Sequence, residues 1–353
     1  MEKYIKNKID ALQIIRGYAA ILVALCHIWN DGWLPDTLVE FGGFGVDIFF
    51  VLSGFIMCLT VKLNTGSNAR NAKYFMKKRI SRIYPAYIIC AIPVMLFVTQ
   101  AEGIKDLYFY IGNLLLLPTF TDNPNYRLAL APGWSLTYEM FFYVVFSFVL
   151  LFSSNRKKIL YTVFLILTIG VLLVYLLNIQ GEQLNWVNFS YMIGDTRLLN
   201  FASGIVCYYF YMHFKEKISF HINTGIVLLL IISFITAILI YLKLPNFISR
   251  GVPAIAIIIV FSLINNTSLN NYGMRKLIFL GDASYSIYLI HYYFTFFKFK
   301  ALELVGYNAS MNKVLLLNTV DIIMFILSIA AGCLFYVFVE KPIVNFVSKK
   351  VKA

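Results

Sequence analysis

Long apolar blocks alternate with short polar segments along the whole chain. The blocks are about 17 to 25 residues long, which is the length that an α-helix needs to cross a bilayer. The segment 107–120 is also apolar, but Gly112, Asn113 and Pro118 interrupt it, so we expect a re-entrant or interfacial piece there. We expect about ten membrane-spanning helices, over 11–30, 44–62, 83–100, 134–153, 159–178, 196–213, 222–242, 251–265, 277–297 and 313–338.

The composition agrees with this pattern. Of the 353 residues, 60% are hydrophobic and 13% are charged, and the mean hydropathy is +0.76. A soluble domain of this length does not have such a composition. We therefore expect an all-α, polytopic integral membrane protein with one transmembrane domain over 1–353 and no appended soluble domain.

The positions of the basic residues predict the topology. The net charge of +13 does not indicate a nucleic-acid partner, because the lysines and arginines lie in short loops between apolar blocks. If the N-terminus is inside, roughly three-quarters of these loop charges fall in inner segments, as the positive-inside rule requires. The few outer basic residues then include Lys298 and Lys300. We expect both termini and the 62–82 loop to be cytoplasmic.

Ionisable residues inside the predicted helices indicate a polar cavity, because such groups are costly in a bilayer and usually line a site or a pathway. Arg16 and His27 are eleven positions apart, so they share one helix face at a separation of roughly 16 Å. Five helices each carry one ionisable group in the predicted outer half: His27, Asp47, Glu139, Arg197 and His291. A partner that merely satisfies each group is the simplest explanation for any single one. For all five together, we expect a cavity.

His27 is the candidate general base, because an unperturbed imidazole titrates near neutral pH. Glu139 could orient it and stabilise its charged form, as a carboxylate does in a catalytic triad. Ser284, Tyr288 and His291 share one face of a predicted helix, which suits a structural polar seam as well as catalysis. No spacing typical of metal ligands is present, so we expect no metal.

The inner side carries a different signal, between the second and third predicted helices. Arg79 and Arg82 lie three positions apart in RNAKYFMKKRISRIYPAY, on one face of a helix that enters the membrane. Guanidinium groups bind phosphate well, although ordinary inside-positive charge would explain most basic loops. A phosphate-bearing donor held inside and a base near the outside suggest that a group is carried across the membrane.

The chain resembles the acyltransferase-3 family of bacterial integral-membrane O-acyltransferases. The resemblance covers nearly the whole chain and rests on ordered motifs: Arg16 followed by His27, FFVLSGF, KKRISRIYPAY, WSLTYEMFFY, TRLLNFASGI, SYSIYLIH and FVEKPI. These motifs hold Trp134 and Ser135 beside Glu139, and Tyr285 beside Ser284. We expect these residues, with Asp47, Arg197, Tyr288 and His291, to line the polar cavity.

The resemblance implies a ten-helix domain in the bacterial cytoplasmic membrane. It implies an acyl-CoA donor, which we take to be acetyl-CoA, and an acceptor hydroxyl on an extracytoplasmic glycan or glycolipid. By analogy, Arg16 and His27 are the essential pair of the first helix, and Arg79 with Arg82 binds the donor, whose thioester passes Arg16. Direct transfer and an acyl-enzyme both stay open, although no G-x-S-x-G elbow marks a serine nucleophile.

Two other functions fit the same intramembrane charges. A secondary transporter or a flippase for a polar or lipid-linked substrate could use them for transport, and a non-catalytic subunit could use them to hold its helices together. Binding or hydrolysis of acyl-CoA by the purified protein would separate the enzyme from the transporter. The sequence does not predict the oligomeric state.

Overall fold

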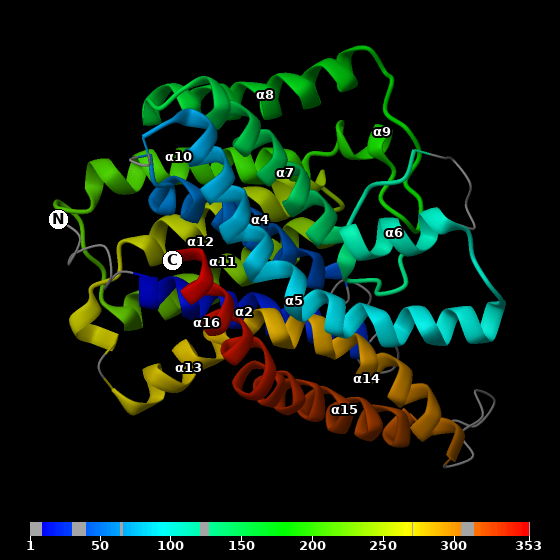
Figure 1. The fold of residues 1–353 in the computed structure, drawn as a ribbon. Helices are drawn as coiled ribbons and strands as arrows, with labels where there is room; N and C mark the ends of the chain where they lie inside the picture. Colours follow the sequence, from blue (N-terminus) through cyan, green and yellow to red (C-terminus); the bar gives the residue numbers. More distant parts are fainter. Residues whose placement is uncertain are drawn as a thin grey trace. The chain divides into compact units, whose positions relative to one another are not determined.

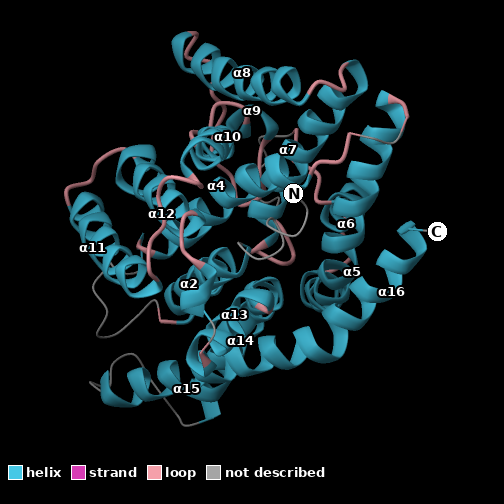
Figure 2. Cartoon of the chain, turned by 90° about the vertical axis from the view of Figure 1, so that its left-hand side faces the viewer, coloured by secondary structure: helices cyan, strands magenta, loops and turns pink. Residues whose placement is uncertain are grey.

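The computed structural model describes residues 9–29, 40–63, 66–120, 127–269, 271–304 and 314–352. These residues form helices and loops (Figure 2), and their strand-type pairing is limited to two isolated bridges, Thr119–Asn188 and Phe220–Ile264. The predicted all-α fold class is therefore confirmed.

The helices are labelled in chain order (Figure 1). Their bounds are α2 Ile9–Ile28, α4 Gly42–Thr60, α5 Asn68–Glu102, α6 Leu107–Leu115, α7 Gly133–Phe152, α8 Arg156–Leu176, α9 Phe189–Met192, α10 Arg197–Phe214, α11 Ile222–Tyr241, η1 Phe247–Gly251, α12 Val252–Ser262, η2 Asn266–Leu269, α13 Tyr272–Asp282, α14 Ser284–Leu304, α15 Val314–Phe335, η3 Tyr336–Glu340 and α16 Lys341–Lys352.

The protein is a multi-pass membrane protein. Among the described residues, seven helices are long and apolar enough to cross a bilayer, and the apolar stretch Phe247–Ser262 is shorter. Helix α10 coincides with a further predicted span, whereas the predicted span over 277–297 crosses the break between α13 and α14; neither α10 nor α14 is among the seven. The count of ten and the cytoplasmic side of the termini stay predictions. Four basic residues used for the topology, Lys3, Lys6, Lys8 and Lys313, lie outside the described residues.

The segment expected as a cytoplasmic loop over 62–82 is largely helical, which corrects the predicted boundary. Helix α5 begins at Asn68, because the Ser67 hydroxyl accepts a hydrogen bond from the Arg70 amide at 3.3 Å. The charged start of this helix is amphipathic and continues without a break into the apolar span. Hydropathy detects only the apolar part, so it places the boundary too late.

The predicted interruption of 107–120 is confirmed. Helix α6 ends at Leu115, and Leu116 adopts a left-handed conformation with φ of 54°. The buried Asn113 holds this turn in place: its Oδ1 accepts from the Ala129 amide at 2.7 Å, and its carbonyl accepts from the Tyr87 hydroxyl at 2.8 Å.

The chain divides into two compact units. Unit 1 comprises 1–52 and 206–339, and unit 2 comprises 53–205 and 340–353. In unit 1, α2 packs against α12, α13, α14 and α15, and α14 packs along α15 (Figure 1). In unit 2, α5 packs against α6, α7 and α16, and α7 packs against α8. The prediction of a single domain stays a prediction.

A close helix approach in unit 2 depends on glycine. A Cβ atom added at Gly54 of α4 would overlap the backbone carbonyl of Phe201 in α10. By contrast, nothing lies within 4 Å of a Cβ added at Gly170 of α8. Small residues let helix backbones approach closely in membranes, so Gly54 has a packing function that Gly170 lacks.

Candidate functional site

Unit 1 brings His27 and His291 together. Their ring centroids are 5.1 Å apart with an angle of 38° between the rings. His27, on the last turn of α2, is exposed, whereas His291 on α14 is fully buried. Both ring nitrogens of His291 are buried, and the ring lies next to the backbone groups of Ile287 and Tyr288 in the preceding turn of α14.

The hydrogen bond made by His27 determines which nitrogen can act as a base. His27 Nδ1 lies 3.0 Å from the carbonyl oxygen of Val23, one turn earlier in α2. A carbonyl can only accept, so Nδ1 carries the proton of the neutral ring. The lone pair is then on Nε2, and that nitrogen is the one available to take a proton from a substrate.

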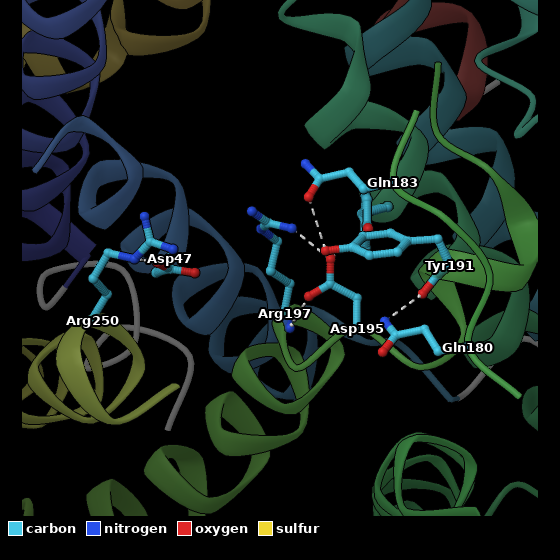
Figure 3. Close-up of polar contacts among 8 residues, drawn as sticks. Asp47, Gln180, Gln183, Tyr191, Asp195, Arg197 and Arg250 are labelled. Carbon is cyan, nitrogen blue, oxygen red and sulfur yellow. Dashed lines mark hydrogen bonds and ion pairs between the residues drawn. The ribbon is translucent and has the colours of Figure 1, made fainter. Parts of the chain in front are cut away.

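Asp47 has a charged partner, Arg250, that the sequence pattern does not indicate. Arg250 Nε lies 3.3 Å from Asp47 Oδ2, and both side chains are largely buried (Figure 3). Arg250 lies in η1, a π-helical turn, and its guanidinium group lies against Gly43, where a Cβ atom would collide with it. The glycine-rich start of α4 is the one sequence signal that could have indicated a bulky neighbour.

Unit 2 places Glu139 in a hydrogen-bonded chain. The Ser53 hydroxyl donates to Glu139 Oε1 at 2.9 Å, and the Tyr143 hydroxyl donates to the same oxygen. Tyr143 lies one helical turn after Glu139 in α7. This chain holds the carboxylate in one orientation. His27 belongs to unit 1, so the predicted role of Glu139 as its orienting partner stays a prediction.

The two arginines of α5 differ in their surroundings. Arg79 is 5% exposed, and its Nη2 donates to the Thr60 hydroxyl at 2.9 Å. Its guanidinium carbon lies 5.5 Å from the ring centroids of both Phe75 and Tyr143. Arg82 is half-buried. Arg79 therefore stabilises the end of α4, while Arg82 is the more accessible of the two guanidinium groups.

Arg197 takes part in a second polar group of unit 2. Its Nη1 lies 2.5 Å from Asp195 Oδ2 (Figure 3). Its guanidinium carbon lies 4.9 Å from the ring centroid of Trp134. The Tyr138 hydroxyl donates to the same Asp195 oxygen at 2.6 Å. The predicted residues Trp134 and Arg197 are thus in contact, and Asp195 and Tyr138 are additions that their motifs did not reveal.

Tyr191, in α9, extends this group. Its hydroxyl donates to Gln183 Oε1 at 3.2 Å (Figure 3). Burial and then the Asp195 carboxylate raise the pKa of the Tyr191 hydroxyl. The hydroxyl therefore stays protonated and serves as a hydrogen-bond donor.

The remaining predicted residues lie on the expected helices. Arg16 is half-buried in α2, and its Nη1 donates to Gln13 Oε1 at 3.0 Å. The Ser135 hydroxyl donates to the Pro132 carbonyl at 3.3 Å. Ser284 and Tyr288 share the buried face of α14 with His291, as predicted, whereas Tyr285 is half-buried.

The structure thus gathers the predicted residues in separate groups. Unit 1 holds the histidine pair and the ion pair of Asp47, and unit 2 holds the chain around Glu139 and the group around Arg197. A single polar cavity for all five ionisable residues stays a prediction. Across the part of the chain that the structure describes, no three His, Cys, Asp or Glu side chains are grouped to hold a metal ion.

Comparison with known proteins gives one family. A family model described as an acyltransferase domain matches residues 9–337. The O-acetyltransferase OatA of Staphylococcus aureus is 26% identical over 318 residues, which are 82% of this chain and 51% of that protein. The peptidoglycan O-acetyltransferase OatA of Listeria monocytogenes is 25% identical over 322 residues, 82% of this chain and 50% of that protein.

A further similarity is to ORF330 of Acidianus two-tailed virus, which carries an acetyltransferase name. It is 26% identical over 297 residues, 81% of this chain and 83% of the viral protein. The chain therefore spans about half the length of the two bacterial relatives and most of the viral one. No solved structure matches.

Proposed function

Because the chain belongs to the acyltransferase-3 family that its motifs resemble, and is an enzyme of the acyltransferase class, we propose that it O-acetylates a cell-surface glycan or glycolipid. The donor in this proposal is cytoplasmic acetyl-CoA, and the acceptor is a hydroxyl group on the outer side of the membrane. The names of the two bacterial relatives support O-acetyl transfer, and the name of the Listeria protein supports a glycan acceptor.

The observation that carries the proposal is the environment of His27. The ring is exposed, and the Val23 carbonyl keeps the proton on Nδ1. Nε2 takes the proton of the acceptor hydroxyl while the hydroxyl oxygen attacks the thioester carbonyl. The carbon–sulfur bond then breaks, the coenzyme A sulfur takes up a proton, and an ester remains on the acceptor. A general base of this kind contributes about 10² to 10⁴-fold to the rate.

Arg82 is the proposed contact for the donor phosphates. It lies half-buried on the helix that also carries Arg79, and guanidinium groups bind phosphate through paired hydrogen bonds. Arg79 supports this end of the helix through Thr60 and the two aromatic rings. In this scheme the two arginines act at the donor side, and His27 acts on the acceptor.

The test uses the full chain in phospholipid vesicles with acetyl-CoA and a chitin oligosaccharide. Mass spectrometry should detect an acetyl ester on the sugar and an equal amount of free coenzyme A. His27→Ala should lower this rate by at least about a hundredfold with unchanged expression and Tm. A variant that keeps more than half of the wild-type rate would show that His27 is not the base.

A further inference from the structure

A buried ion pair lies in unit 1 and has no role in the mechanism proposed above. Lys298 of α14 and Asp321 of α15 are 2.8 Å apart, and their side chains are 1% and 0% exposed. The predicted span over 277–297 places Lys298 among the outer loop charges. The structure corrects this, because α14 continues to Leu304 and takes Lys298 into the helix packing.

Lys298 has a second contact, which reaches the helix that carries His27. Its Nζ donates to the carbonyl oxygen of Ile28 at 2.9 Å. Ile28 is the last residue of α2, where backbone carbonyls lack partners within the helix. A lysine at this end satisfies such a carbonyl and interacts favourably with the helix dipole.

Trp29, the residue after the last turn of α2, is held by α15, the helix that also carries Asp321. Trp29 Nε1 donates to Asn318 Oδ1 at 2.8 Å, and Asn318 Nδ2 donates to the Val314 carbonyl at 2.6 Å. Asn318 lies three positions before Asp321, so both side chains share one face of α15. Two consecutive residues after His27 are therefore fixed by side chains from α14 and α15.

Stability alone does not explain this arrangement. Removing two charges from water is expensive, and a buried ion pair is often no more stabilising than apolar side chains of similar size. Inside a membrane protein, buried ionisable residues usually serve a site. The atom that Lys298 binds is one residue away from the imidazole proposed as the base.

We propose that Lys298 and Asp321 are positioning residues for His27. Lys298 fixes the last turn of α2 by binding the Ile28 carbonyl, and Asp321 holds the ammonium group in place. The fixed turn keeps the His27 ring in one orientation toward its substrate. The catalytic part of this inference rests on the function proposed above, whereas the structural part does not.

The main variant is the double substitution Lys298→Met, Asp321→Asn. It removes both charges at similar volume, so it leaves no unpaired charge in the protein interior. The matched control is Lys300→Met, Glu303→Gln. These residues also lie on α14 and form an ion pair at 2.8 Å, but both are exposed and neither contacts α2 in the described structure.

Two measurements are made on full-length protein in vesicles. The first is kcat and the KM for acetyl-CoA in the chitin oligosaccharide assay. We expect the main variant to lose at least about tenfold in kcat, because a misplaced catalytic group is costly, while the donor KM changes less than twofold. The second is hydrogen exchange of the amides in the last turn of α2, which should become faster in the main variant and stay unchanged in the control.

The outcomes are distinguishable. Unchanged exchange in the last turn of α2 would overturn the proposal, whether or not kcat falls. Faster exchange with wild-type kcat would also overturn the positioning role. If the wild-type protein forms no acetyl ester, the proposed function fails, and if His27→Ala keeps wild-type activity, His27 is not the base, even where exchange confirms the helix contact. Should the double variant not fold, Trp29→Phe removes the indole N–H that binds Asn318, together with part of the ring system, and leaves the ion pair in place; we expect a smaller increase in exchange at the same turn.

Discussion

The two arginines of α5 should respond differently to the same substitution. Lysine keeps the positive charge but loses the planar group that makes paired hydrogen bonds. Arg79 is buried against Thr60, Phe75 and Tyr143, while Arg82 is half-buried. We therefore expect Arg79→Lys to lower the stability of the protein and Arg82→Lys to weaken binding of the donor.

The contacts set the magnitudes. A hydrogen bond from a charged group contributes about 1.5 to 3 kcal/mol, and a cation–π contact contributes about 0.5 to 2 kcal/mol. Arg79→Lys should thus reduce the free energy of unfolding by roughly 2 kcal/mol or more, enough to lower the Tm by several degrees. The loss of one such hydrogen bond to phosphate at Arg82 should raise the Kd for coenzyme A roughly tenfold.

Calorimetric binding of coenzyme A and thermal unfolding in detergent measure both effects. Thr60→Val is the matched control, because it removes the hydroxyl that accepts from Arg79 and leaves both arginines in place. It should reproduce part of the Tm decrease without any change in the Kd.

Two results would contradict this reasoning. If Arg82→Lys binds coenzyme A as tightly as wild type, Arg82 does not contact the donor phosphates. If Arg79→Lys weakens binding of coenzyme A at unchanged Tm, then Arg79 itself binds coenzyme A. Its contacts with Thr60 are then not what stabilises this region.

Three further predictions concern the topology, the Asp47–Arg250 ion pair and the packing at Gly54. Lys77→Cys, in a background without native cysteines, should resist an impermeant thiol reagent in intact cells, and labelling would reverse the predicted topology. Asp47→Asn should cost about 3 kcal/mol or more by leaving Arg250 unpaired, whereas adding Arg250→Met should recover much of the Tm. Gly54→Ala should lower the Tm by several degrees because the added methyl group collides with backbone; Gly170→Ala, which meets open space, should leave the Tm unchanged or raise it slightly.

The sequence predicted the helical elements well, because hydropathy over about 20 residues reports burial in lipid directly. All ten predicted spans fall on helical residues of the structure, but the span over 277–297 crosses the break at Ala283 between α13 and α14. The errors lie where a helix continues beyond its apolar part. The charged start of α5 precedes the predicted span, which begins at residue 83, and Lys298 falls in a predicted outer segment although α14 carries it into the packed interior.

The candidate site was predicted less completely. The face shared by Ser284, Tyr288 and His291 follows from helical periodicity, and the structure confirms that all three are buried. The partners of the predicted residues were not foreseen. Arg250, which pairs with Asp47, lies more than two hundred positions away along the chain, and a pattern of local spacing contains no information about such a contact.

The unbroken length of α5 has a consequence for how the enzyme responds to its lipids. Its 35 residues extend about 52 Å, although the hydrocarbon core of a bilayer is only about 30 Å thick. If residues 83–102 occupy that core, as the predicted third span implies, Arg79 and Arg82 lie at its border with the headgroups. Because one continuous helix, with Pro85 and Pro93 in its interior, joins these arginines to the opposite end of the span, hydrophobic mismatch would move them relative to the headgroup layer. Acyl-chain length of the surrounding lipids thereby becomes a physical control on how far the guanidinium groups extend into the aqueous phase.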